Sequence, residues 1–153
     1  MNSEFRRFVD QLPGLLKSLK GSRLISRSDL TGIPEMGVYV FLEKGKPMYV
    51  GRTDDMKGRI QRHSRPSSGH GSATFAFLIA KKAAGGKGID LDVSREVLEK
   101  DPAFVPLFNK AKERVRTMPV KVIRIDDAIL QTLFEVYAAV ALETTEYNSF
   151  VNH

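Results

Sequence analysis

The sequence contains no cysteine and three histidines, His63, His70 and His153. A chain without cysteine forms no disulfide and offers no thiolate to zinc, and three histidines spread along the chain do not make a zinc cluster. A hard cation held by oxygen ligands remains open. No apolar run approaches the roughly 20 residues of a membrane helix, and charged residues interrupt the N-terminal region where a secretory signal would lie. These absences predict a cytoplasmic protein that does not bind a membrane.

Basic residues are missing from the C-terminal part of the chain. Residues 126–153 contain five acidic residues and no lysine or arginine, so their net charge is −5. Because the whole chain carries +6, the first 125 residues carry +11. The acidic residues of this segment are Asp126, Asp127, Glu135, Glu143 and Glu146.

The positive charge gathers in two clusters, at 52–65 and at 110–124. A basic surface neutralises phosphates and releases counterions, which gives salt-sensitive binding to nucleic acid without sequence preference. The alternative is a solvated basic face that serves solubility. The predicted nucleic-acid-binding residues are Arg52, Lys57, Arg62, Arg65, Lys110, Lys112, Arg114, Arg116 and Lys121.

The 153 residues, 42% hydrophobic and 27% charged, have the size and composition of one globular domain. Hydrophobic spacing predicts helices over 3–20, 54–63, 73–84, 101–116 and 126–142, the first of them kinked or divided at Pro13-Gly14. Alternating apolar residues predict strands over 37–42, 47–51 and 120–125. The segment 64–72 is rich in Ser, Gly and Pro, which indicates a mobile loop.

Two short segments, Gly37-Val38-Tyr39 and Tyr49-Val50-Gly51, lie a hairpin apart. If Glu43 faces Pro47 across a three-residue loop, Phe41 opposes Tyr49, and both tyrosines project from one face of the hairpin. A slip of one residue would place them on opposite faces. The register therefore decides whether the two tyrosines can act together.

The helix that follows carries Met56, Arg59, Ile60 and His63 on one stripe. An arginine on an apolar face needs a compensating partner, or its charge is directed to a ligand. The structural alternative is a buried arginine paired with a carboxylate and a core histidine with satisfied nitrogens. The spacing alone leaves both interpretations open.

On the last predicted helix, Glu135 lies with Gln131 and Thr132, opposite an apolar stripe of Ile129, Leu133, Val136 and Val140. Read from spacing alone, this position favours a solvated surface glutamate.

The ordered set of residues resembles the GIY-YIG nuclease superfamily. In that family two tyrosine-bearing strands precede a helix with an arginine and a histidine or tyrosine, and a later helix carries a metal-binding glutamate ahead of an asparagine. The chain departs from the family by valine for isoleucine in both motif halves and by Met56 where leucine is usual. The matching residues are Tyr39, Tyr49, Arg59, His63, Glu135 and Asn148, with Gly37 and Gly51 as supporting residues.

The resemblance implies an α/β (α+β) domain over 1–153, with a small three-stranded antiparallel sheet flanked by helices. The match covers 37–63 and, more loosely, 120–148, so residues 1–36 have no counterpart in the family and would form an N-terminal helical extension. The segments 37–63 and 120–148 would form the catalytic core, with 64–116 as a helical basic insertion.

The resemblance also implies a metal-dependent endonuclease that hydrolyses phosphodiester bonds, most naturally of DNA, with one Mg²⁺ or Mn²⁺ on Glu135. Glu143 and Glu146 are competing metal ligands, although they lie closer to Asn148 than the family pattern has its glutamate.

Arg59 would hold the scissile phosphate. The general base would be Tyr39 or His63, between which the sequence does not choose, and Tyr49 would position water or share the proton. A single active site nicks one strand, so cutting a duplex would need a homodimer or a second event.

Two other functions remain. The first is a nucleic-acid-binding module that keeps the fold without the chemistry. The second is an interaction protein whose amphipathic N-terminus docks a partner.

Overall fold

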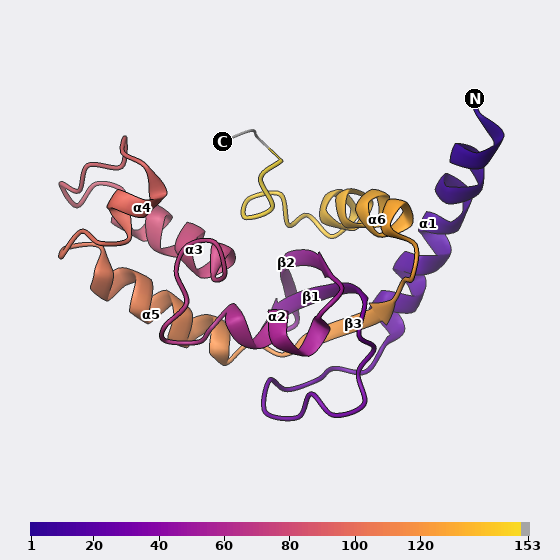
Figure 1. The fold of residues 1–153 in the computed structure, drawn as a ribbon, viewed down its shortest axis with the longest axis horizontal. Coiled ribbons are helices and arrows are strands. Elements are labelled where there is room, and N and C mark those ends of the chain that lie inside the picture. Colours follow the sequence, from indigo (N-terminus) through magenta and orange to yellow (C-terminus); the bar gives the residue numbers. More distant parts are fainter. Residues whose placement is uncertain (151–153) are drawn as a thin grey trace. The chain divides into compact units, whose positions relative to one another are not determined.

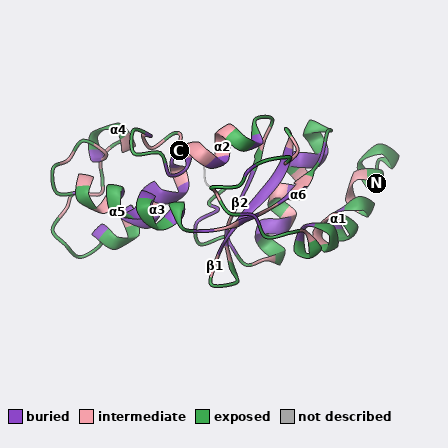
Figure 2. Ribbon diagram, turned by 90° about the horizontal axis from the view of Figure 1, so that it is seen from below, coloured by how far each residue is buried: buried purple, intermediate pink, exposed green. Residues whose placement is uncertain are grey.

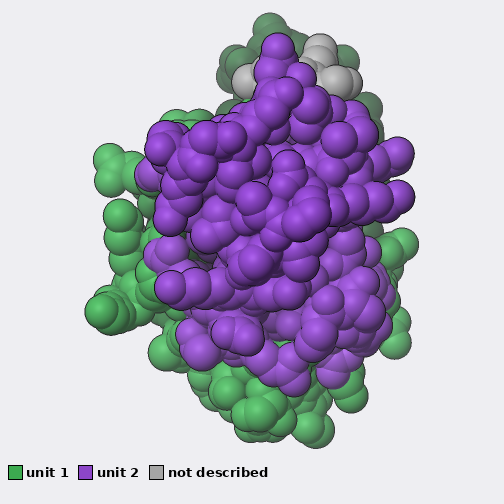
Figure 3. Space-filling view, turned by 90° about the vertical axis from the view of Figure 1, so that its left-hand side faces the viewer, with its two compact units in different colours: residues 1–57, 119–153 green, residues 58–118 purple. Residues whose placement is uncertain are grey.

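The computed structural model describes residues 1–150, and the chain forms two compact units (Figures 1 and 3). Unit 1 contains residues 1–57 and 119–150, and unit 2 contains residues 58–118, which include the predicted insertion. The helix α2 (Met56–Arg62) begins in unit 1 and ends in unit 2. The last three residues of the predicted domain, among them His153, lie outside the described residues.

Unit 1 is built on an antiparallel sheet of three strands, β1 (Gly37–Glu43), β2 (Lys46–Thr53) and β3 (Val120–Arg124). The order β2-β1-β3 makes β1 the central strand, and its residues 37–42 are all buried (Figure 2). The sheet and its flanking helices confirm the predicted α+β fold.

The turn between β1 and β2 is shorter than predicted. Glu43 pairs with Lys46 rather than Pro47, which leaves a two-residue turn. Both turn residues, Lys44 and Gly45, have positive φ, 51° and 80°, as the favoured type I′ hairpin turn requires. A β-bulge between Phe41 and Leu42 then shifts the pairing by one residue. Phe41 consequently opposes Tyr49, as the sequence predicts.

Helices α1 (Ser3–Gly21) and α6 (Ala128–Ala141) pack with the sheet face that carries Val38, Val40 and Val50 (Figure 1). The α1 helix is continuous through Pro13, and its first turn is exposed (Figure 2). The segment predicted as an N-terminal extension nevertheless belongs to the core. The helical residues buried in this core are Leu12, Leu19, Leu130, Phe134 and Ala138.

Unit 2 is helical and contains α3 (Thr74–Ala84), α4 (Arg95–Leu98) and α5 (Val105–Arg116). Helices α3 and α5 pack together around Phe77, whose ring centroid lies 5.3 Å from that of Phe104 and 5.7 Å from that of Phe108. Each such aromatic pair contributes about 0.5–1.5 kcal/mol beyond area burial. In the described part of the chain, no helix has both the length and the apolar character that crossing a bilayer requires.

Candidate active site

The two tyrosines of the motif lie on one face of the β1–β2 hairpin. Tyr39 pairs with Gly51 and Phe41 pairs with Tyr49, and alternate residues of one strand share a face with their cross-strand partners. The Tyr39 ring meets the Phe41 ring edge to face at a centroid distance of 5.7 Å. Tyr39 is buried, whereas Tyr49 is half-buried.

The Tyr39 ring lies over Gly51. A methyl group on Gly51 would overlap the Tyr39 hydroxyl and ring, so only glycine lets the tyrosine occupy this position. The glycine of the second motif half therefore makes room for the tyrosine of the first.

Gly37 is required by the backbone at the start of β1. Its φ of +149° lies in a region that L-residues rarely adopt, and a Cβ would overlap the backbone carbonyl oxygen of Ile123. Gly37 is the first residue of the central strand and pairs with Thr53 on β2 and with Arg124 on β3. A side chain is thus excluded at Gly37 by the Ile123 backbone and at Gly51 by the Tyr39 side chain.

Asn148 holds the outer edge of β2. Its Oδ1 accepts the Val50 N–H at 2.8 Å, and its Nδ2 donates to the Val50 carbonyl at 2.7 Å. The Thr144 hydroxyl donates to the same Oδ1 at 2.8 Å. The carboxamide therefore satisfies both main-chain groups of an edge-strand residue, as a neighbouring strand would.

Asn148→Ala is expected to lower the free energy of unfolding by about 2–4 kcal/mol, because it leaves buried polar groups of Val50 and Thr144 without a partner. The urea midpoint reports the loss. Asn109→Ala, at an exposed asparagine of α5, is the control and should change little. Equal urea midpoints for the two variants would contradict a stabilising role for the hydrogen bonds of the Asn148 side chain.

Glu135 does not lie on the solvated side of α6. The buried residues of this helix include Gln131, Ala138 and Ala139, which flank Glu135 on the helical wheel, and Glu135 itself is half-buried. Ile129, Val136 and Val140, the stripe opposite, are exposed. The interpretation of Glu135 as a fully solvated glutamate is therefore wrong, because the core-facing side of α6 is the one next to it.

Arg59 lies in unit 2 and is half-buried. One of its terminal nitrogens, Nη1, donates to the Ser72 carbonyl at 2.8 Å. A guanidinium has five N–H donors, so this one bond leaves donor capacity for an anion.

His63 is fully buried at the end of α2, and its amide donates to the Arg59 carbonyl at 3.2 Å. Burial lowers the pKa of the imidazole well below 6.5, and the charges of Arg59 and Arg62 lower it further. His63 is therefore neutral at neutral pH, in the form that accepts a proton, but burial makes it a weak base.

Protonation of His63 is expected to destabilise the protein in acid. The unfolded chain binds this proton below about pH 6.5, while the lowered pKa prevents the folded chain from doing so. Stability should thus fall as the pH drops from 6.5 towards the folded pKa, by at most about 1.4 kcal/mol per pH unit. Urea unfolding at pH 7.5 and 5.5 measures this slope, and His63→Gln should reduce it. An identical slope in the variant would exclude His63 as its source.

The net charge of the chain lies on unit 2. Unit 2 contains 12 Lys and Arg against six Asp and Glu, whereas unit 1 contains 12 of each, so the +6 belongs to unit 2. Most of the predicted nucleic-acid-binding residues are exposed, and Arg62 is half-buried. The exposed ones are Arg52, Lys57, Arg65, Lys110, Arg114 and Arg116.

Two predicted nucleic-acid-binding lysines have structural partners instead. Lys112 is buried, its Nζ donates to the carbonyls of Pro66 and Ser68 at 2.8 and 3.0 Å, and it lies 4.3 Å from the Phe108 ring centroid. Burial lowers its pKa, although Glu99 raises it. Lys121 donates to the Lys20 carbonyl near the end of α1. The prediction for Lys112 is wrong because this lysine shares the buried stripe of Phe108, Ala111 and Val115 on α5, a pattern already visible in the sequence.

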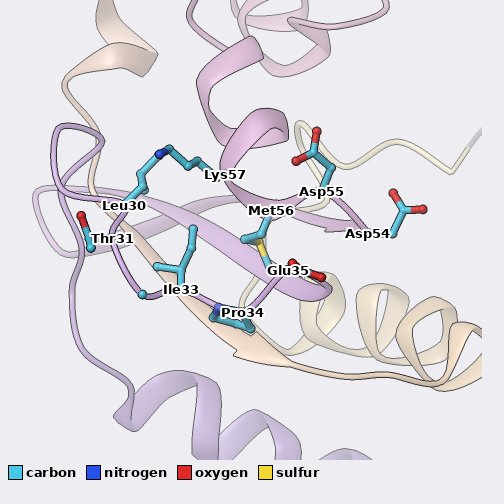
Figure 4. A pocket seen from close by; sticks show the side chains of 10 residues that line it. Leu30, Thr31, Ile33, Pro34, Glu35, Asp54, Asp55, Met56 and Lys57 are labelled. Atoms are coloured by element: carbon cyan, nitrogen blue, oxygen red, sulfur yellow. The ribbon is translucent and has the colours of Figure 1, made fainter.

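A pocket of about 620 Å³ in unit 1 lies between the loop 30–35 and the start of α2 (Figure 4). Its wall includes Glu35, Asp54 and Asp55, but Figure 4 shows the two aspartates pointing in different directions. Among residues 1–150, no group of three His, Cys, Asp or Glu is placed to hold a metal ion. Of the predicted site residues only Lys57 lines this pocket.

The predicted site residues thus fall into two sets. Unit 1 places Tyr39, Tyr49 and both motif glycines on the hairpin, joins Asn148 to β2 and carries Glu135 on α6, which packs with β2. Arg59 and His63 lie in unit 2. Comparison with known proteins finds no match to a family, to a curated protein or to a solved structure.

Proposed function

We propose that the protein is a metal-dependent endonuclease of the GIY-YIG type that hydrolyses phosphodiester bonds, with DNA as the expected substrate. The observation that carries the proposal is the hairpin, in which both motif tyrosines share one face, the Tyr39 ring covers Gly51 and Asn148 holds Val50. The order of the remaining site residues along the chain supports the same function.

One hard divalent cation would be held through a single protein carboxylate, that of Glu135. Glu135 offers carboxylate oxygens from a half-buried position, and the described residues hold no cluster that would enclose a metal. Mg²⁺ commonly binds through one or two carboxylates, keeps several waters and takes phosphate oxygens from the substrate. Glu135 would hold Mg²⁺ or Mn²⁺ in this way, and the bound ion would stabilise charge on the leaving oxygen.

Arg59 would bind the scissile phosphate. Its guanidinium has the planar fork that matches phosphate oxygens, and the Ser72 carbonyl fixes one corner of it. Such an anchored arginine is prepared to offset the charge that grows in the transition state.

Tyr39 would take the proton of the attacking water. A free phenol has a pKa near 10, so a nearby cation must stabilise the phenolate. His63 is the weaker candidate for the base, because burial and two neighbouring arginines disfavour the protonated form that a base must reach. We assign His63 to packing and orientation of the Arg59 helix, and Tyr49 to positioning water.

Unit 2 would supply much of the affinity for the nucleic-acid backbone. Its charge of +6 and the exposed residues Arg65, Lys110, Arg114 and Arg116 support salt-sensitive binding to phosphates. These contacts would position the substrate without reading its sequence.

The test is nicking of supercoiled plasmid, together with cleavage of labelled single-stranded, duplex and branched oligonucleotides. Wild type should cut with Mg²⁺ or Mn²⁺ and not with EDTA, and Arg59→Gln purified in the same way should cut at least about 100-fold more slowly. Salt-dependent binding of DNA without cleavage by either protein would replace the nuclease with the binding module. Cleavage that Arg59→Gln retains in full would point to a contaminant.

A further inference from the structure

Unit 2 contains a hollow of about 330 Å³ between the C-terminal half of α5 and the segment 64–66. This volume lies at the lower end of the roughly 300–1,000 Å³ that ligand pockets commonly have. The wall residues on α5 follow helical spacing, so a single face of the helix supplies them. The wall is formed by Ser64, Pro66, Asn109, Lys112, Glu113 and Arg116.

The hydroxyl of Ser64 is a buried polar group without a hydrogen-bond partner. Ser64 is 3% exposed, and no atom of residues 1–150 forms a hydrogen bond with its Oγ. Most buried polar side-chain atoms in proteins are paired, either with the protein or with ordered water. In the wall of a hollow, an unpaired hydroxyl therefore indicates a polar group that the hollow receives.

The segment opposite α5 is held in place by side chains of that helix. The Lys112 ammonium donates to the carbonyls of Pro66 and Ser68 at 2.8 and 3.0 Å, so this lysine binds the segment rather than a ligand. Arg116 makes a long bond, from Nη1 to the Ser64 carbonyl at 3.5 Å. A guanidinium has five N–H donors, and this bond leaves most of them for a ligand. The wall is thus preorganised around a guanidinium with donors to spare.

We propose that this hollow binds a phosphate monoester, either the terminal phosphate of a nucleic-acid strand or that of a free mononucleotide. The Arg116 fork matches two phosphate oxygens, and the Ser64 hydroxyl would donate to a third. A terminal phosphate presents three acceptor oxygens, whereas a phosphodiester inside a strand has one fewer. The positive charge of Lys112 in the same wall favours an anion over a neutral ligand. A strand end as the source rests on the proposed function, but recognition of the phosphate group does not.

The test compares one short single strand that carries a 5′-phosphate, a 3′-phosphate or hydroxyls at both ends. Fluorescence anisotropy of the full chain in EDTA, with an internal dye on the strand, measures the three affinities. Their ratio to the affinity of the unmodified strand is the phosphate gain, which should be about tenfold or more for at least one wild-type complex. Arg116→Gln and Ser64→Ala should each lose most of this gain. Lys100→Gln also removes an exposed positive charge of unit 2, but outside the hollow, and should keep it.

Glu113 predicts an effect of opposite sign. Its carboxylate lies in the same wall and opposes an anion, so two cations and one carboxylate leave the wall with a net charge of +1. Glu113→Gln removes this repulsion and should raise the phosphate gain severalfold. A lower gain in Glu113→Gln would show that the hollow receives a cation or an amine, and would overturn the proposal.

The stability of Ser64→Ala separates a ligand from a structural water. Because the hydroxyl that it removes is unpaired, the urea midpoint should stay unchanged or rise while the phosphate gain falls. A lower midpoint with an unchanged gain would show that the hydroxyl bonds an ordered water instead, and would overturn the proposal.

A nucleoside 5′-monophosphate identifies the source of the phosphate. Displacement of the phosphorylated strand at concentrations near the Kd of that strand would establish the free mononucleotide as the ligand, and displacement only at far higher concentrations would establish the strand end. Equal affinity for all three strands, with no heat when the monophosphate is titrated into the protein, would overturn the proposal. So would a gain that both Arg116→Gln and Ser64→Ala keep, because it would then be a general effect of added charge. These readouts in EDTA involve no cleavage, so they stand or fall separately from the nuclease.

Discussion

Glu135→Gln is expected to remove metal-dependent cleavage while DNA affinity measured in EDTA stays unchanged. The amide keeps the size of the side chain and its half-buried position but cannot supply the negative charge that a hard cation requires. Loss of one electrostatic stabiliser of a transition state typically slows a reaction on the order of 100- to 1,000-fold. Cleavage rates over a titration of Mg²⁺ and of Mn²⁺ measure the effect, and fluorescence anisotropy measures the affinity.

Glu143→Gln is the matched control, since Glu143 is an exposed glutamate just beyond the end of the same helix. It should cut as wild type does. If Glu143→Gln loses cleavage and Glu135→Gln keeps it, the metal ligand has been assigned to the wrong carboxylate. A loss of DNA affinity in EDTA that accounts for the whole effect of Glu135→Gln would remove the evidence for a metal role.

Tyr39→Phe is expected to lower the single-turnover cleavage rate by about 100- to 10,000-fold, the range for loss of a general base, with little change in DNA affinity. Phenylalanine keeps the edge-to-face contact with Phe41 and still fits over Gly51. Only the hydroxyl is lost, so the fold should survive. Urea unfolding of the variant verifies that it does.

The control for this variant is Tyr137→Phe. Tyr137 is a half-buried tyrosine of α6, and its ring packs beside that of Phe134 at a centroid distance of 6.4 Å. Removing its hydroxyl should leave cleavage intact. Near-normal turnover by Tyr39→Phe would exclude Tyr39 as the base, and His63→Gln would then be tested in its place.

The hairpin could be predicted because its signals are local. Alternating apolar residues fix two strands, and the pairing of Phe41 with Tyr49 follows from their spacing. The sequence predicts a turn that is one residue too long, yet the bulge next to Phe41 compensates for the difference. The resemblance identifies Gly37 and Gly51, whereas the steric need for glycine at these positions comes from Ile123 and Tyr39 and follows only from the packed sheet.

Helix α6 shows where sequence reasoning reaches its limit. Its residues AILQTLFEVYAAVA are apolar on nearly every side, so the wheel offers two candidate core faces. The sheet accepts the face with Leu130, Phe134 and the small Ala138, and leaves the Ile129 and Val140 side in solvent. Only the tertiary structure makes that choice, and it decides the surroundings of Glu135.

The basic clusters illustrate a different limit. The sequence predicts basic surfaces near residues 52–65 and 110–124. Arg65 and Lys110 are exposed to solvent, as this prediction requires. Charge counting cannot distinguish a lysine that meets solvent from one that supports a loop. Lys112 belongs to the second kind, because its Nζ donates hydrogen bonds to two backbone carbonyls of the segment 64–72.

The division of unit 1 along the chain has a consequence for synthesis on the ribosome. Unit 2 is continuous in sequence, whereas unit 1 needs residues from both sides of it. The β1–β2 hairpin emerges early, but β3, the α6 side chains that fill its core, and Asn148 at its outer edge emerge only after residue 118. A nascent chain thus carries an incomplete sheet with an open edge while unit 2 is already whole. In that interval both edges of the hairpin are open, the β1 edge that later pairs with β3 and the β2 edge that Asn148 later covers, and unpaired strand edges favour aggregation.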